Sequence, residues 1–523
     1  MDFIARRRPG ARLERALALI GIGLLTAAAA ACGAGESASE TGDGDQDRTV
    51  VVAAQQVTSL DPGLAGTTQA YSLLGSVYST LTRFTADGSL VGDLATEWRQ
   101  DDATTWTFTL REGATFEDGE PLDAETVVWN LERAHTDDKL TGVARIASII
   151  ETAEAVSPTE VRFTTSGTYL NLPGAVSTWY FLAPEWSASH DPNTSVNASG
   201  PYKVVSFAAA TGTVLERNPG YYGEAPAVED LEYRVFADQA TLISALLADE
   251  VDVATLVPPS DLEQIAETGD YEVGGDAGYR IHVLQVNALK PVWQNQDVRE
   301  AVALAIDRES ITGSVLGGFT EPSRKQVFGV GFVGYQDDLE PWPHDPDRAR
   351  QLLEGAGAVG TAVELAVPIG YFNGGETAAE TIVEQLDQVG FEATLNVVPV
   401  TGWGDVIASG ADGPDLVYIG EASASNSSAE ALLKYQSKDV YPSSNTKGPV
   451  SEEIDGAIAD AWAAQTIEDQ AAAVERATNA IIDTVRVIDL WPQPQTFVAR
   501  KDLDVGTRPY DYLRGFEIAW AGS

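Results

Sequence analysis

The side chains that could carry out chemistry in this sequence are few and widely spaced. The four histidines, His135, His190, His282 and His344, form no H-E-x-x-H motif and no close pair. A zinc site needs three or four converging nitrogen, sulfur or oxygen ligands, which this spacing does not supply. No G-x-S-x-G occurs, so a serine hydrolase would lack its nucleophile elbow. We therefore expect a protein that is not an enzyme and that holds no metal ion or other cofactor.

Two glycine motifs of the form G-x-G-x-x-G occur, at Gly329–Gly334 and at Gly355–Gly360. A dinucleotide-binding motif needs a strand before the glycines and a helix after them, so that the phosphates meet the helix N-terminus. The first motif lies in a loop that leads to a run of acids. The second follows a predicted helix and precedes a predicted strand, which is the reverse order. Both motifs therefore predict turns rather than a nucleotide site.

The single cysteine, Cys32, stands at the end of an apolar run. A segment with five arginines comes first, and an uncharged run over residues 16–31 precedes the cysteine. A basic start, a short apolar stretch and small residues before a cleavage point are typical of a secretory signal peptide. The run is shorter than the roughly 20 residues that a membrane-spanning helix needs. The sequence therefore predicts that residues 1–31 are a signal peptide.

The stretch Ala29–Cys32 resembles a bacterial lipobox, with Ala29 in place of the usual leucine. In a lipobox the cysteine is lipidated and becomes the new N-terminus, so the resemblance implies that Cys32 is a lipid attachment site. The alternative is a secreted protein without a lipid. In either case one cysteine cannot form a disulfide within the chain. Residues 32–48 are small and polar, without an apolar period, and predict a flexible tether.

Acidic side chains dominate the composition. The 523 residues carry 33 Lys and Arg against 78 Asp and Glu, a formal net charge of −45, which becomes −48 without residues 1–31. A surface of this kind repels nucleic acid and anionic lipid, so we expect no nucleic-acid partner. A chain of this length suffices for two or three domains with a large core.

The segment Asp93–Ala134 has the clearest local pattern, a strand, two turns and a helix. Thr105–Arg111 alternates apolar residues with threonines, which predicts a half-buried strand. Two turn dipeptides follow, Glu112-Gly113 and Asp118-Gly119. Asp123 is then a predicted N-cap, because apolar residues recur after it at helical spacing.

The order of these elements, DLATEW followed by TWTFTLREGATFEDGEPLDAETV, resembles the signature of a known family. The family is that of the extracytoplasmic solute-binding proteins of ABC importers that carry peptides and nickel (family 5). Ser59–Pro62 (S-L-D-P), Gly200–Tyr202 (G-P-Y) and Val298–Arg308 (V-R-x-A-x-x-x-A-I-D-R) are similar to further motifs of this family. The resemblance covers residues 49 to about 500.

This resemblance implies an α/β fold with two lobes, the large three-subdomain form of the type II periplasmic-binding-protein-like fold. A strand, a helix and a strand predicted at 363–368, 378–389 and 392–398 form a βαβ unit and imply a mostly parallel sheet covered by helices. A further helix is predicted at 140–153. The expected boundaries are 49–290 and 485–523 for lobe 1, with a subdomain at about 84–190, and 291–484 for lobe 2.

Carrying over the family's arrangement places a set of residues round a ligand held between the lobes. Trp403 is expected to offer the ligand a flat apolar face. The full set is Thr67, Thr68, Arg145, Gln285, Trp403, Tyr418, Glu421 and Trp491.

The sequence departs from the family after Asp415. In peptide-binding members the stretch reads D-x-x-x-x-G-W-x-A-D, and its second aspartate pairs with the ligand's α-ammonium. Here Glu421 falls at the tryptophan, and Ser423 or Ala424 stands where the aspartate would be. Three interpretations remain open. Glu421 pairs with the ammonium, or the serines and Asn426 bind the ligand through uncharged groups, or the stretch is a variable loop.

The resemblance therefore implies capture of an extracellular solute, a peptide before other solutes, and its delivery to an ABC permease. The alternative among binding proteins is an oligosaccharide or another neutral polar solute. The alternative from another class is a secreted acidic enzyme. We expect a monomer, lipid-anchored on the extracytoplasmic face of the cell membrane, whose partners are its ligand and the permease subunits.

Overall fold

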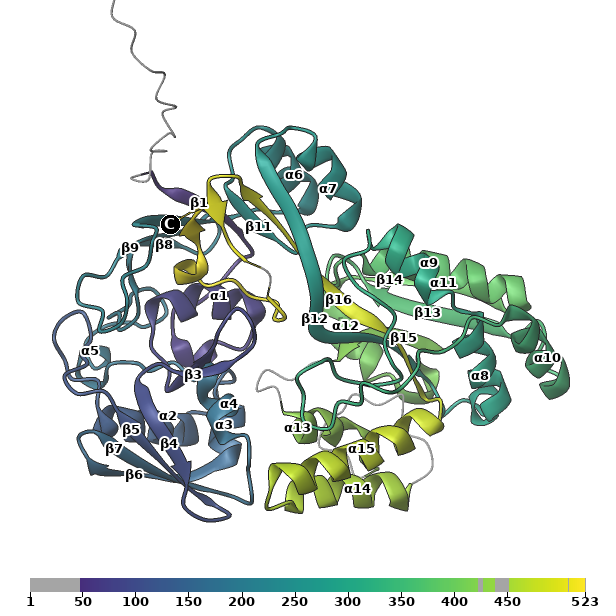
Figure 1. Ribbon diagram of the computed structural model, residues 1–523, viewed down its shortest axis with the longest axis horizontal. Coiled ribbons are helices and arrows are strands. Elements are labelled where there is room, and N and C mark those ends of the chain that lie inside the picture. Colours follow the sequence, from purple (N-terminus) through teal and green to yellow (C-terminus); the bar gives the residue numbers. More distant parts are fainter. Residues whose placement is uncertain (1–47, 422–426, 438–450, 507, 523) are drawn as a thin grey trace, which may run out of the picture. The chain divides into compact units, whose positions relative to one another are not determined.

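The computed structural model describes residues 48–421, 427–437, 451–506 and 508–522 (Figure 1). Residues 45–523 form one compact unit. Cys32, the signal peptide, the tether before residue 48 and the segment with Ser423, Ala424 and Asn426 lie outside the described residues.

A ten-stranded sheet runs through this unit. From one edge to the other its strands are β14 (Glu392–Val398), β13 (Ala362–Pro368), β15 (Leu416–Glu421), β12 (Tyr271–Val286), β16 (Val487–Arg500), β11 (Val253–Thr255), β1 (Val50–Ala54), β10 (Asp230–Val235), β9 (Gly212–Arg217) and β8 (Tyr202–Ala208). β13 and β14 are parallel, as the βαβ spacing predicted. β12 pairs antiparallel with both β15 and β16, so the sheet as a whole is mixed rather than mostly parallel.

The two long strands β12 and β16 lie side by side in the middle of this sheet (Figure 1). Their register shifts between Ala277 and Ile281, and Pro494 and Pro492 of β16 stand opposite these two residues. Proline has no N–H to donate, so the ladder of hydrogen bonds is weakened at this point by the sequence itself.

Helices cover both faces of the sheet around β13 and β15. One core joins α8 (Gln296–Ala305), α10 (Pro346–Ala356) and α11 (Gly375–Val389) to the face that carries Leu284 and Tyr418. Another joins α13 (Ser428–Leu432), α14 (Glu452–Ala463) and α15 (Ile467–Asp483) to the face that carries Ile281 and Val283. At the other end of the sheet, α1 (Thr68–Val77) packs on β1 and β8–β10, and α6 (Gln239–Leu247) and α7 (Pro259–Ala266) pack beside β11.

A separate four-stranded antiparallel sheet has the order β4 (Ala95–Gln100), β5 (Thr105–Leu110), β7 (Glu160–Thr165), β6 (Ile150–Ser157). The predicted strand at 105–111 is confirmed as β5, and Asp123 caps α2 (Ala124–Thr136) by accepting from two backbone N–H groups. The helix predicted at 140–153 is confirmed only over 144–149, and its last four residues belong to a strand. α3 ends at Ile149 (Ala144–Ile149), and the chain continues directly as β6, because pairing with β7 overrides the helix propensity of its glutamates and alanines.

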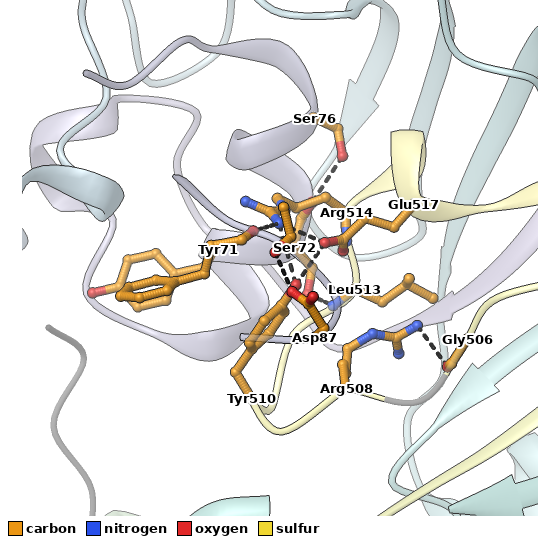
Figure 2. A network of polar contacts seen from close by, with 12 residues as sticks. Tyr71, Ser72, Ser76, Asp87, Gly506, Arg508, Tyr510, Leu513, Arg514 and Glu517 are labelled. Carbon is orange, nitrogen blue, oxygen red and sulfur yellow. Dashed lines mark hydrogen bonds and ion pairs between the residues drawn. The ribbon is translucent and has the colours of Figure 1, made fainter. Parts of the chain in front are cut away.

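The C-terminal segment folds back onto α1, and two serines one helical turn apart hold it there (Figure 2). Ser72 Oγ accepts from the Leu513 N–H (3.2 Å), and Ser76 Oγ accepts from the Gly515 N–H (2.7 Å). The apolar residues and the two serines of α1 thus have different roles. The apolar residues enter the core, and the serines satisfy backbone donors of a segment that has little regular structure of its own.

Arg514 is the centre of this network (Figure 2). Its guanidinium forms an ion pair with Glu517 (2.5 Å), and both side chains are less than a tenth exposed. Tyr510 OH donates to the same carboxylate (2.7 Å), and Arg514 also donates to the Phe84 carbonyl (2.5 Å). These contacts satisfy most of the polar atoms of the buried pair, although Arg514 Nε has no hydrogen-bond partner.

Candidate functional site

Four of the predicted ligand residues lie on three neighbouring strands in the middle of the large sheet. Gln285 is on β12, Tyr418 and Glu421 are on β15, and Trp491 is on β16, and none of them is more than 2% exposed. Tyr418 and Glu421 are three positions apart on one strand, so they point to opposite faces of the sheet. The strand pairing thus brings these four residues close together, but they are divided between the two faces of the sheet.

Glu421 is held by side chains of its own chain. Its Oε1 accepts from Gln285 Nε2 (3.0 Å) and from Tyr435 OH (2.9 Å). Lys434 Nζ forms an ion pair with its Oε2. Lys434 and Tyr435 come from one short turn, η6 (Leu433–Tyr435), which follows α13. The sequence left Glu421 open as a partner for a ligand's ammonium, and in the structure a lysine of the same chain takes that place.

A second polar set, which the sequence analysis missed, lies on the opposite face. Tyr418 OH lies 2.6 Å from His282 Nδ1, and His282 Nε2 lies 3.1 Å from Gln493 Oε1. Gln493 Nε2 donates to Asp511 Oδ1 (3.1 Å), which orients the amide. Because Gln493 Oε1 can only accept, His282 carries its proton on Nε2 and accepts from Tyr418 at Nδ1.

Asp511, in the C-terminal segment, ties this set to both long strands. Its Oδ2 accepts from Arg280 Nε (2.9 Å) and Nη2 (2.5 Å), and its Oδ1 accepts from Gln495 Nε2 (2.5 Å) as well as from Gln493. Arg280 also donates to the Gly420 carbonyl (3.4 Å). One carboxylate therefore connects β12, β16 and the chain's last segment.

Burial dominates the electrostatics of these strands. It lowers the pKa of His282 from 6.5 to about 3, so the ring is neutral at pH 7. Burial, and after it the positive charge of Arg280, also lowers the pKa of Lys434 to about 8. With a pKa of about 8, Lys434 is mostly protonated at pH 7 and forms an ion pair with the Glu421 carboxylate. The sequence did carry a signal for the set around His282, because this histidine interrupts the apolar run Ile281–Leu284.

Trp403, which was predicted to offer a ligand a flat apolar face, lies on the helix that follows β14. It belongs to α12 (Val400–Ile407), is 7% exposed, and packs in a small core with Ala366, Val398 and Val417. Its ring therefore stabilises α12 on the sheet and has no free face for a ligand. Trp491 is likewise fully buried, with its ring centroid 6.5 Å from that of Tyr418.

Thr67 and Thr68 lie at the start of α1, away from the strand residues. Thr67 is the N-cap, and its Oγ1 accepts from the Ala70 N–H (3.3 Å). Thr67 is exposed and Thr68 is half-buried, so both keep polar groups within reach of solvent. Their position follows from the S-L-D-P turn, because Asp61 closes that turn by accepting from the Gly63 N–H (2.8 Å).

Arg145 joins the four-stranded sheet region to α13. Its Nη2 donates to the Ala175 carbonyl (2.9 Å), and its Nη1 lies 3.7 Å from Glu430 Oε2. Tyr169 OH donates to the same glutamate oxygen (3.0 Å), and the Tyr169 ring lies 5.6 Å from that of Trp462 on α14. The sequence analysis named Arg145 but neither of these partners, because they come from segments far apart in the chain.

The hydrogen bonds, ion pairs and ring contacts of these side chains are made with other residues of the same chain. Within the described ranges, no group of three or more His, Cys, Asp or Glu side chains is placed to hold a metal ion. The helices of the described part of the chain include none that is long and apolar enough to cross a membrane.

The family model of the bacterial extracellular solute-binding proteins, family 5 Middle, matches residues 89–439. The nickel-binding periplasmic protein of Escherichia coli (strain K12) is 28% identical over 295 residues, which are 54% of this chain and 56% of that protein. The glutathione-binding protein GsiB of Salmonella paratyphi A is 26% identical over 315 residues, which are 59% of this chain and 61% of that protein. The match thus spans 56% to 61% of the length of these curated relatives.

Two solved structures share the fold over almost all of their length. NikA from Brucella suis in complex with Fe(III)-EDTA has a TM-score of 0.79 and 22% identity, over 91% of this chain and 100% of that one. The ABC transporter-associated periplasmic binding protein DppA from Helicobacter pylori in complex with the peptide STSA has a TM-score of 0.74 and 18% identity, over 90% and 98%. The predicted two-lobe α/β fold is thereby confirmed.

Proposed function

Because the chain belongs to the bacterial extracellular solute-binding proteins of family 5, we propose that it captures a solute outside the cytoplasm and delivers it to an ABC permease. The family match over residues 89–439 is the observation that carries this proposal. The relatives are solute-binding proteins rather than enzymes, as the absence of catalytic motifs predicted. The solute therefore leaves the protein chemically unchanged.

A small peptide is the first candidate for the solute. Relatives are named for glutathione, which is itself a tripeptide, and one solved structure holds the peptide STSA. A neutral polar solute such as an oligosaccharide is the second candidate, and the occupied carboxylate of Glu421 favours it.

The solute is held, in this proposal, between lobe 1 (49–290 and 485–523, with the subdomain at about 84–190) and lobe 2 (291–484). By these bounds β12 and β16 belong to lobe 1, and β12 pairs with β15 of lobe 2. Thr67, Thr68 and Arg145 keep accessible polar groups and are the proposed direct contacts. Gln285, Tyr418, Glu421 and Trp491 support them from the central strands, and Trp403 has a structural role in α12.

The proposed location is the extracytoplasmic face of the membrane, with a lipid on Cys32 and the protein acting as a monomer. The support is the apolar run that ends at the only cysteine. Cys32→Ala should yield a protein that no longer labels with palmitate and no longer sediments with membranes. Undiminished labelling of this variant would contradict the anchor and would leave the solute-binding proposal untouched.

Solute capture is tested with purified protein that has been unfolded and refolded to remove any bound molecule. The refolded protein is incubated with a tripeptide pool and, separately, with an oligosaccharide pool, and bound mass is read by native mass spectrometry. A captured solute should return unchanged and should raise the free energy of unfolding by about 2.7 kcal/mol at a hundredfold excess over Kd. Conversion of pool members into new products would contradict a binding role.

A further inference from the structure

We propose that Asp511, in the C-terminal segment, is a positioning residue that fixes the two long strands where they pass between the two halves of the protein. It thereby sets the balance between an open and a closed form, and it affects solute capture without touching the solute. This inference rests on the proposed function, in which a solute is held between two lobes, and adds a residue that governs their closure.

The first support is an interruption of the hydrophobic packing within both long strands. On β16 the buried core residues end at Trp491, which packs with α8, α10 and α11, and resume at Val498, beside α6 and α7. The described residues between them read Pro-Gln-Pro-Gln-Thr-Phe, and none of these belongs to a buried core. On β12 the buried core residues likewise lie at Tyr271 and again from Ile281 onward. Each strand thus leaves one set of cores and enters another.

The hydrogen-bond ladder is interrupted at the same point. Within the described strands, residues 278–280 of β12 have no partner in its register with β15 or β16. The Tyr279 N–H donates to the Pro509 carbonyl instead (2.6 Å), so the C-terminal segment supplies the hydrogen bond that β16 does not. A hinge needs only a few residues that absorb a change of backbone angle, and this interruption provides them. In this proposal the two lobes meet here, inside β12 and β16 rather than at their ends.

The Asp511 carboxylate lies against both strands at this interruption. Its Oδ2 accepts from Arg280 Nη2 on β12 (2.5 Å). Its Oδ1 accepts from Gln493 Nε2 (3.1 Å) and Gln495 Nε2 (2.5 Å) on β16. Hydrogen bonds to a charged group are stronger than those between neutral groups. One carboxylate therefore fixes the relative position of the two strands where their own pairing fails.

The contacts around Asp511 reach both halves of the protein. Two positions along the chain, the Leu513 N–H donates to Ser72 Oγ on α1 (3.2 Å), which holds this segment on the helix (Figure 2). In the opposite direction, Arg280 Nη1 donates to the Gly420 carbonyl on β15 (3.4 Å). A change at Asp511 should therefore alter the position of α1 relative to β15.

In the arrangement that Asp511 holds, the region of the four-stranded sheet contacts α14 and the turn after it. Gln465 Nε2 donates to Thr168 Oγ1 (3.0 Å), and the ring centroids of Tyr169 and Trp462 lie 5.6 Å apart. These contacts join parts of the chain that belong to different proposed lobes, so the arrangement corresponds to the closed form. Loss of the Asp511 contacts should lower the population of this form.

The test measures closure without a ligand. Thr168→Cys and Gln465→Cys are introduced together with Cys32→Ala, so that the two new thiols are the only ones in the chain. The rate at which a short bifunctional maleimide joins them reports the population of the closed form. Asp511→Asn should lower this rate about tenfold, the factor expected for the loss of a hydrogen bond to a charged group. It should also raise the radius of gyration measured by small-angle X-ray scattering.

Asp415→Asn is the matched control. The Asp415 side chain has the same exposed fraction as that of Asp511 (13%), pairs with Lys290 (3.0 Å) and accepts from Trp293 Nε1 (2.8 Å). It stands directly before β15, away from the interruption, so its loss should destabilise the protein and leave the cross-linking rate unchanged. An unchanged or higher rate in Asp511→Asn, or an equal fall in Asp415→Asn, would overturn the inference.

A second variant keeps the test open if Asp511→Asn does not fold. Arg280→Met with Asp511→Leu removes both charges, so its free energy of unfolding should recover toward that of the wild type. Its cross-linking rate should stay low, because no carboxylate joins the two strands. Recovery of both quantities would show a purely structural ion pair and would overturn the inference. If the rates fall as expected and neither solute pool binds the wild type, the proposed solute classes are wrong and the role of Asp511 stands.

Discussion

In two buried polar regions of this protein, burial and the neighbouring groups act against each other on the pKa values. A different one of the two prevails in each region. In the C-terminal network of Figure 2, burial by itself would lower the pKa of Arg514, but Glu517 and the neighbouring tyrosines raise it well above its ordinary value. Burial would likewise raise the pKa of Glu517, and Arg514 lowers it instead. At His282 on β12 and at Lys434 in the turn η6, burial prevails and lowers the pKa of both side chains.

This difference shows which buried groups keep their charge as the pH changes and which groups change it. Arg514 and Glu517 are three residues apart, so the chain delivers the partner charge together with the charge itself. His282 has no carboxylate in direct contact, and its two ring nitrogens face a tyrosine and an amide. The first region therefore fastens the C-terminal segment at any ordinary pH, whereas the second changes its charge within an experimentally accessible range.

The largest expected effect comes from breaking the first region. Arg514→Met leaves the Glu517 carboxylate buried without its cation and should lower the free energy of unfolding by about 3–5 kcal/mol. Urea denaturation at pH 7 measures it. If the single variant does not fold, Arg514→Met with Glu517→Leu removes both charges and should recover most of the loss.

The control is Arg476→Met, at a surface pair with Asp460 in which both side chains are more than half exposed. This variant should lower the free energy of unfolding by less than about 1 kcal/mol. Equal costs at the two sites would contradict the comparison.

A smaller effect on the free energy of unfolding is expected from lowering the pH, because of His282 on the central strands. The pKa of His282 is about 3 in the folded state and 6.5 when unperturbed, so between these values the unfolded state binds more protons. Stability contributed by neutral His282 is therefore present above pH 6.5 and is lost as the pH falls toward 3. From pH 7 to pH 5 this loss amounts to about 2 kcal/mol.

The measurement is the difference in free energy of unfolding between pH 7 and pH 5 for the wild type and for His282→Gln. Glutamine keeps hydrogen-bonding groups for Tyr418 and Gln493 but does not titrate, so the variant should be less sensitive to acid by that amount. His190→Gln, at an exposed histidine, is the control and should behave like the wild type. The same pH dependence in all three proteins would show that burial of His282 is not the cause.

The smallest effect is expected at Glu430, which lies outside both regions and is more exposed than Arg514 and Glu517. Its oxygen accepts from Tyr169 and lies near Arg145, in a partly exposed position. Glu430→Gln keeps an acceptor for Tyr169 and removes only the charge, so the cost should be below about 1 kcal/mol and should shrink in high salt. Glu430→Ala should cost more than Glu430→Gln. A loss above 3 kcal/mol for the glutamine variant would place Glu430 with the fully buried pairs.

The sequence predicted those parts of the fold that are encoded locally. The alternation at Thr105–Leu110, the N-cap at Asp123 and the βαβ unit around β13 and β14 depend on residues close together in the chain, and all three are confirmed. The helix predicted over 140–153 failed where local propensity and distant pairing disagree, because β6 exists only through its partner β7.

The candidate site was predicted less well, for a related reason. Gln285, Tyr418 and Glu421 lie on two neighbouring strands, but the partner of a side chain cannot be derived from its own neighbourhood in the sequence. Lys434 lies 13 positions after Glu421, and Asp511 lies 231 positions after Arg280. Only the folded sheet shows that one carboxylate is already occupied and that the other links three segments.

The position of β16 in the sheet has a consequence for how the chain is made. β16 comprises residues 487–500, close to the end of the sequence, yet it lies in the middle of the sheet between β12 and β11. The half of β12 from Tyr271 to Ala277 pairs with β16 alone. During synthesis the centre of the sheet therefore stays open until residue 500 has emerged, and pairing at such sequence distance is slow.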